Sequence, residues 1–212
     1  SPETISTIAE ITADYDEVPV IAYMPNLSWW REELIDEYLD AFRELLLPQT
    51  SVLVGNHSTL WRWLLPDWSG ERSPTARDIA RAASEMGVPY TLVTGIPLPE
   101  QFVENVLASP QTVIGSGKFE LFDATFSGAG DTLSAALTAL VASGNDLGEA
   151  TSEALGYLDR CLDAGFRPGM GHVVPDRMFW AQPDDDEDDD ESPIDEAQAL
   201  EGFVMPPHDT KH

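Results

Sequence analysis

The sequence predicts an α/β fold of three layers: a mostly parallel central sheet, helices on both of its faces, and a hairpin toward the C-terminus. Three short apolar runs carry the prediction, at residues 18–24, 51–55 and 90–95. None of them alternates with polar residues, which is typical of strands that are covered on both faces. Helical patterns separate the runs, and this alternation is typical of parallel strands joined by right-handed crossovers.

The first half of the chain also carries signals for where its helices begin and end. Ser1, Pro2 and Glu3 form a helix start, with an N-cap serine, a proline at the first position and an acid in the first turn. A second helix presents one apolar face and should end at Pro48. The residues of that face are Leu34, Ile35, Tyr38, Leu39, Phe42, Leu45 and Leu46. Two further helices are predicted at 57–65 and at 75–86, the latter closed by Gly87.

The pattern changes after the third apolar run. Residues 111–126 resemble two strands joined by a Gly-Ser-Gly turn, which predicts a hairpin. Two helices should follow, at about 130–143 and 147–164. These elements predict one domain over residues 1–182, and the acidic composition beyond it predicts a disordered tail over 183–212.

Charge and composition exclude several classes of partner. The formal net charge is −27, so nucleic acid and anionic lipid surfaces are unfavourable partners. No run of about 18 apolar residues could span a membrane. The only cysteine, Cys161, falls within a helical pattern and is predicted to lie in the core. A chain without an intrachain disulfide fits a reducing compartment, and we expect a cytoplasmic protein.

Two glycine-containing stretches suggest phosphate binding, and the first fails. Residues 115–118, Gly-Ser-Gly-Lys, lack both the upstream glycine and the following hydroxyl residue of a P-loop, because Thr112 and Phe119 hold those positions. A hairpin turn is therefore the better interpretation. Lys118 is the only lysine before the tail and could still face an anion.

The second stretch, Ser-Gly-Ala-Gly-Asp at 127–131, stands directly before a helical pattern. Gly128 and Gly130 would allow backbone N–H groups to converge on an anion, and the helix N-terminus would strengthen that site. Asp131 would sit in the first turn, where the helix dipole favours its ionised, proton-accepting form. Such an arrangement suits phosphoryl transfer to an alcohol. On spacing alone, an ordinary glycine turn before an acidic helix start is the more common alternative.

The same stretch resembles the signature of the ribokinase-like superfamily, in which a Gly-Ala/Thr-Gly-Asp turn opens a long helix. The preceding Thr-Phe-Ser at 125–127 is similar to the pyridoxal kinase and hydroxymethylpyrimidine kinase branch. Residues 28–60 and 157–180 resemble bacterial hydroxymethylpyrimidine/phosphomethylpyrimidine kinases of thiamine biosynthesis. The resemblance implies phosphorylation of a pyrimidine alcohol, or of its monophosphate, with ATP and Mg²⁺. Enzymes of this branch are commonly dimers, which implies a homodimer.

The resemblance also assigns roles to individual residues. It implies that Asp131 deprotonates the substrate hydroxymethyl group and that Gly128, Ala129 and Gly130 form the anion hole. Two further residues fall at positions that the family places near ATP phosphates, namely Thr94 and Asn56. A strand-end threonine bonded to backbone and an ordinary turn asparagine are the structural alternatives for these two.

The chain departs from the family pattern in ways that bear on metal binding and substrate binding. Met24 and Thr59 occupy positions where the family usually carries acids that help to hold Mg²⁺ through water, so no metal ligand is predicted. The substrate-holding strand and glycine-rich turn that open family members are also expected to be missing. A pyridoxal-type vitamin kinase and a non-catalytic nucleotide-binding domain therefore remain as alternatives.

Other conspicuous residues have simpler explanations. The tryptophans at 29, 30, 61, 63 and 68 could stack on a heterocycle, but such aromatics more often pack helices onto a sheet or fill a subunit interface. His172 has no metal-ligating neighbour in the sequence, and His208 and His212 lie in a proline-containing segment where a zinc pair is not expected.

Overall fold

We describe the protein from a computed structural model, which defines residues 1–181. The first compact unit spans Ser1–Phe179 and contains all the strands and helices discussed below, apart from the end of a 3₁₀ turn, η3 (Phe179–Ala181). The predicted boundary at residue 182, the acidic tail, His208 and His212 lie outside the described residues.

A five-stranded sheet in the order β1-β2-β3-β4-β5 forms the centre of this unit. Its strands are β1 (Ile21–Met24), β2 (Val52–Asn56), β3 (Tyr90–Leu98), β4 (Phe102–Ala108) and β5 (Val113–Glu120). The first three run parallel, and β4 and β5 are antiparallel to their neighbours. The carboxyl ends of β1, β2 and β3 therefore meet at one edge, where ligands bind in open parallel sheets.

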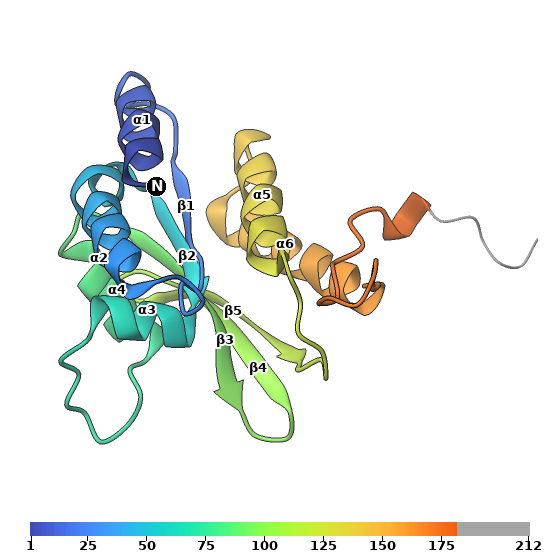
Figure 1. The fold of residues 1–212 in the computed structure, drawn as a ribbon. Coiled ribbons are helices and arrows are strands. Elements are labelled where there is room, and N and C mark those ends of the chain that lie inside the picture. The colour runs from blue at the N-terminus through green and yellow to red at the C-terminus, as the bar shows by residue number, and fades with distance from the viewer. Residues whose placement is uncertain (182–212) are drawn as a thin grey trace, which may run out of the picture. The chain divides into compact units, whose positions relative to one another are not determined.

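Helices cover both faces of the sheet, which confirms the predicted three layers (Figure 1). One face carries α1 (Pro2–Ala13), α2 (Glu32–Ala41), α3 (His57–Leu64) and α4 (Ala76–Ser84). A π-turn, η1 (Phe42–Leu46), and a 3₁₀ turn, η2 (Leu47–Gln49), extend α2 as far as Pro48 and the residue after it. The other face carries α5 (Ala129–Ala142) and α6 (Leu147–Asp163). No helix of the described part of the chain is long and apolar enough to cross a membrane.

Strand β2 shows why its apolar run does not alternate with polar residues. Leu53 points into the core under α1–α4, whereas its neighbours Val52 and Val54 point into the core under α5 and α6. All three side chains are buried because both faces of the sheet are covered. Cys161 of α6 is fully buried and reduced, as predicted.

The hairpin exists, but its predicted position is wrong. The turn lies at residues 109–112, where the Ser109 hydroxyl accepts the N–H groups of Gln111 and Thr112, and Gly115–Lys118 lies inside β5. Strand β4 was not predicted because Glu104 and Asn105 interrupt its apolar run. The Lys118 ammonium lies 3.8 Å from the centre of the Phe102 ring on β4, which accounts for this cation without a phosphate.

The aromatic side chains of the first half form a continuous series of ring contacts. Trp30 contacts Tyr38, Tyr38 contacts Phe42, and Phe42 contacts Trp63, with ring centres 5.2 to 5.9 Å apart. Three of the tryptophans thus differ in role: Trp63 is buried, Trp30 is half-buried, and Trp29 is 79% exposed. The structural explanation of packing holds for Trp30 and Trp63.

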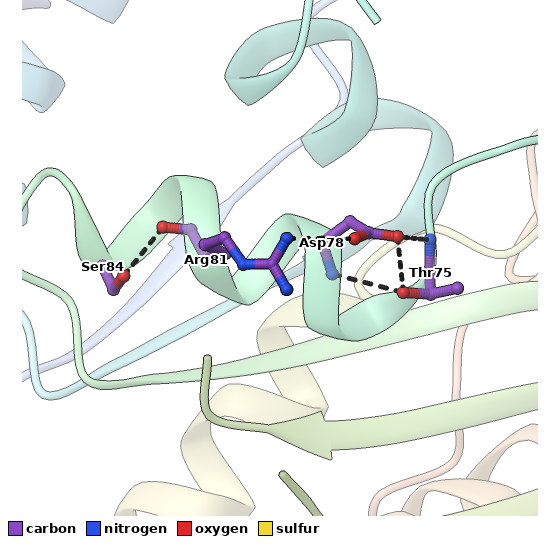
Figure 2. A network of polar contacts seen from close by, with 4 residues as sticks. All are labelled: Thr75, Asp78, Arg81 and Ser84. Atoms are coloured by element: carbon purple, nitrogen blue, oxygen red, sulfur yellow. Dashed lines mark hydrogen bonds and ion pairs between the residues drawn. The ribbon is translucent and has the colours of Figure 1, made fainter. Parts of the chain in front are cut away.

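Helix α4 begins with a capping box (Figure 2). The Thr75 hydroxyl accepts the Asp78 N–H at 3.2 Å, and Asp78 Oδ2 accepts the Thr75 N–H at 2.9 Å and its hydroxyl at 2.6 Å. The hydrogen bond from the Thr75 side chain is the main cause that lowers the Asp78 pKa. The exposed Arg81 guanidinium adds a 3.6 Å ion pair.

We expect Thr75→Ala to lower the free energy of unfolding by about 1 kcal/mol at neutral pH, since the helix loses its N-cap. The bond from the Thr75 hydroxyl to the Asp78 carboxylate is strongest while Asp78 is ionised, whereas the bond from the Asp78 N–H to the Thr75 hydroxyl does not depend on that charge. The difference from the unsubstituted chain should therefore persist above the ordinary carboxyl pKa of about 3.9 and shrink as the pH falls through the lowered pKa. Urea unfolding at several pH values measures it. Arg81→Gln is the control and should cost a few tenths of a kcal/mol, roughly, because exposed ion pairs contribute little; an equal loss in both variants would contradict the prediction.

Candidate active site

The carboxyl ends of β2 and β3 bring the first two predicted site residues side by side. Asn56 and Thr94 are register partners at the end of the β2–β3 ladder. Directly after them the pairing of β3 with β4 shifts, and Gly95 adopts a left-handed φ of 66°. Asn105 of β4 stabilises this irregularity, because its side-chain oxygen accepts the Gly95 N–H at 2.8 Å. The bulge opens the sheet edge where a ligand could approach.

A cavity of about 300 Å³ lies at this irregular edge. Its wall combines the strand ends, the segment 119–129 and one side of α6, and it includes Ala129 of the glycine turn. The residues that line it on the strand side are Asn56, Thr94, Gly95, Val103 and Asn105. The wall combines polar residues with apolar side chains such as Leu155 and Leu158, which suits a ligand with a polar and an apolar part.

The N-terminus of α5 differs from those of most helices in the described chain because no side chain caps it. Side chains cap α1, α3, α4 and α6, whereas α5 begins at Gly128, whose φ is 87°. The first hydrogen bond of the helix runs from the Thr132 N–H to the Gly128 carbonyl at 3.0 Å. Within residues 1–181 the N–H groups of Ala129, Gly130 and Asp131 have no acceptor. Open amides at the positive end of a helix dipole form an anion site.

Asp131 is exposed on the first turn of α5 and lines a second, larger cavity of about 580 Å³. Thr132, Tyr157, Arg160 and Arg177 line the same cavity. The turn at 128–131 therefore borders two cavities, with Ala129 on the first and Asp131 on the second. A group held by the open amides would lie between the first cavity and the carboxylate of Asp131.

Tyr23 of β1 explains why residue 130 is a glycine. A Cβ atom at Gly130 would overlap the ring and hydroxyl of Tyr23. Burial raises the Tyr23 pKa, and the nearby Asp131 charge raises it further, so the phenol stays protonated. Tyr23 thus fixes how closely the sheet and the first turn of α5 approach one another.

Two of the predicted site residues, Asn56 and Thr94, also form hydrogen bonds with neighbouring parts of the chain. The Asn56 side chain caps α3 by accepting the Ser58 N–H at 3.0 Å, and the Thr94 hydroxyl donates to the Gly55 carbonyl at 3.3 Å. Both residues still line the first cavity, so the local bonds and a ligand role are compatible.

Sequence reasoning missed four residues around the turn: Tyr23, Asn105, Asp159 and Arg177. Asn105 had a usable signal, since an asparagine inside an apolar strand is uncommon. Asp159 lines the first cavity from α6, where burial raises its pKa and the charges of Asp163 and Glu120 raise it further. Tyr23 and Arg177 are brought to the turn by tertiary contacts alone.

The positions where acids were expected lie together but hold none. Met24 and Thr59 both line a third cavity of about 300 Å³ beside α2 and α3. Within residues 1–181 no group of three or more His, Cys, Asp or Glu side chains could hold a metal ion.

The family model for phosphomethylpyrimidine kinase matches residues 1–176. The chain belongs to the phosphomethylpyrimidine kinase family. A search of curated protein sequences found no match.

Solved structures of similar fold include pyridoxal kinases and a protein assigned as a phosphomethylpyrimidine kinase. They include the Bacillus subtilis pyridoxal kinase in an ADP complex, with a TM-score of 0.71 at 22% identity over 86% of this chain and 69% of that one. The Staphylococcus aureus pyridoxal kinase with AMP-PCP and pyridoxal has a TM-score of 0.70 at 17% identity over 86% and 65%. A Bacteroides thetaiotaomicron protein assigned as a phosphomethylpyrimidine kinase and crystallised with pyridoxal has a TM-score of 0.64 at 18% identity over 80% and 62%. The match thus spans about two thirds of the length of these structures, and it confirms the ribokinase-like fold.

We expect Gly130→Ala to destabilise the chain by about 1–3 kcal/mol, because the new methyl group overpacks against Tyr23. Tyr23→Leu should reduce that cost, so the double variant should be more stable than the sum of the single effects. Urea unfolding of all four proteins measures the coupling. Gly156→Ala on α6, where the added methyl meets open space, is the matched control and should be neutral or stabilising by up to about 1 kcal/mol. Additive effects of the first pair would contradict the contact.

Proposed function

We propose that the protein transfers the terminal phosphoryl group of ATP to the hydroxymethyl group of 4-amino-5-hydroxymethyl-2-methylpyrimidine, to its monophosphate, or to both, in thiamine biosynthesis. One observation carries the proposal: the open amides of the α5 turn lie between a cavity with polar strand ends and a cavity that contains Asp131. Family membership supplies the substrate class. The ATP analogue and pyridoxal in the Staphylococcus aureus structure support a nucleotide and a small alcohol as ligands.

In this mechanism the chain positions two reactants on opposite sides of one turn. Asn56, Thr94 and the neighbouring strand ends would hold the nucleotide, and Gly128, Ala129 and Gly130 would stabilise negative charge on the transferring group. Asp131 would accept the proton of the substrate hydroxyl. The alcohol oxygen then forms a bond to the γ-phosphorus while the bond to the bridging oxygen breaks, and ADP leaves.

The site fits ATP better than it fits a protein-held metal ion. The first cavity offers polar groups, apolar walls and the helix N-terminus, which are the features that bind nucleotides. Mg²⁺ remains a prediction of the family resemblance, and no step is assigned to it. A homodimer and a cytoplasmic location also remain predictions.

Substitution of Asp131 tests the proposed base. We expect Asp131→Asn in the full protein to lower kcat by at least about a hundredfold, since the alcohol loses its proton acceptor. Binding of AMP-PCP, measured by calorimetry, should be retained. Asp123→Asn removes an exposed carboxylate from the loop before the turn and serves as the control. Normal turnover by Asp131→Asn would reject the role.

A panel of acceptors separates the alternatives. We expect kcat/KM with ATP to be at least about tenfold higher for the pyrimidine alcohol or its monophosphate than for pyridoxal, because an enzyme discriminates by the contacts its pocket makes. Coupled ADP release measures each rate. A preference for pyridoxal would instead identify a vitamin kinase of the pyridoxal type, as the fold neighbours allow. Nucleotide binding without turnover of any acceptor would identify a non-catalytic domain, which the missing acids at 24 and 59 favour.

A further inference from the structure

The segment that follows α6 places the guanidinium group of Arg177 beside the α5 turn. We propose that Arg177 binds the terminal phosphoryl group of the nucleotide and helps to stabilise it during transfer. The inference rests on the proposed function and adds a residue that neither the sequence motif nor the family assignment identifies. Arg177 lies 46 positions after Asp131 in the sequence, and only the fold brings the two into one cavity.

Backbone hydrogen bonds fix the segment that carries Arg177. Val173 forms a parallel bridge with Phe126, and the Ser127 N–H donates to the Val173 carbonyl at 2.9 Å. Further along, the Asp176 N–H donates to the Cys161 carbonyl of α6 at 2.8 Å. The segment is therefore tied both to the loop that precedes the glycine turn and to the helix beside it.

Side-chain contacts then hold Arg177 itself. The Tyr157 hydroxyl donates to the Arg177 carbonyl at 2.9 Å. The Arg177 Nε donates to the Thr132 hydroxyl at 2.9 Å, and that hydroxyl in turn donates to the Gly128 carbonyl at 2.8 Å. Arg177 Nη2 lies 3.1 Å from the point that a Cβ on Gly128 would occupy. The guanidinium is thus docked directly on the turn whose amides are open.

The position of the Arg177 guanidinium at the N-terminus of α5 is electrostatically unusual, and a bound anion would explain it. A helix N-terminus repels cations, and most stable structures place acids there. Here a guanidinium lies on that positive end in a chain whose net charge is −27 and which has only 11 lysines and arginines. Asp131 on the same turn offsets part of the repulsion. A phosphoryl group would supply negative charge between these groups, since its oxygens can accept hydrogen bonds from the open amides and from the Nη groups together.

The proposed pose places the terminal phosphoryl, rather than an inner one, beside Arg177. The first cavity reaches the turn at Ala129, whereas Arg177 lines the second cavity together with Asp131 and Thr132. In the proposed pose the nucleotide lies in the first cavity and its outermost phosphoryl reaches the turn beside Arg177. Arg177 should therefore distinguish a triphosphate from a diphosphate.

The test compares a triphosphate analogue with a diphosphate on the full protein. Calorimetry gives the dissociation constants of AMP-PCP and ADP for the unsubstituted protein and for Arg177→Gln. We expect the variant to bind AMP-PCP about tenfold or more weakly, as the loss of charged hydrogen bonds implies, and to bind ADP unchanged. Arg177→Lys, which keeps the charge but loses the Nε–Thr132 bond, should fall between the two.

Arg160→Gln is the matched control. Arg160 lines the same cavity, but its guanidinium stacks on Phe179, with 5.2 Å to the ring centre, and not on the turn. The Arg160→Gln variant should therefore leave the ratio of AMP-PCP affinity to ADP affinity unchanged. An equal loss for both ligands in Arg177→Gln, or no loss for either, would overturn the inference while leaving the kinase proposal intact. Failure of the unsubstituted protein to bind any nucleotide would reject the proposed function and this inference with it.

Discussion

The N-terminus of α5 is the constraint on which the rest of the site depends. A left-handed residue at Gly128 starts the helix without a side-chain cap, so the first amides keep their hydrogen-bonding capacity. Unpaired N–H groups cost free energy where water is excluded, and an anion relieves that cost. A bound anion could accept these open amides together and so stabilise the turn.

The surrounding structure holds this turn in place from three directions. Tyr23 of β1 packs against Gly130 from the sheet, and the loop 125–127 is bridged to Val173. Leu133 and Leu137 on the buried side of α5 anchor the helix in the core beneath it. Because the helix, the sheet and the segment after α6 all contact the turn, its backbone amides keep a fixed orientation, and preorganised donors of this kind stabilise developing charge.

Different structural features shape the two cavities beside the turn. The first depends on the bulge at Gly95, which Asn105 stabilises through one hydrogen bond, and on the side of α6 that faces it. The second lies along α5 and α6, where small side chains such as Ala135 and Ala139 leave space and Arg160 and Arg177 supply positive charge. Two spaces that meet at one anion site are the arrangement that a transfer between two substrates requires.

The sequence by itself determined the layers of the fold, the strand runs buried on both faces, and the glycine turn with Asp131, because hydrophobic period and turn chemistry are local properties. It misplaced the hairpin, since Glu104 and Asn105 obscured β4 and a Gly-Ser-Gly stretch imitated a turn. Only the tertiary structure decided that Tyr23 requires a glycine at 130, that Asn105 supports the cavity, and that Arg177 reaches the turn. These contacts join residues far apart in the chain, and their distances are set by how the layers pack, which no local pattern records.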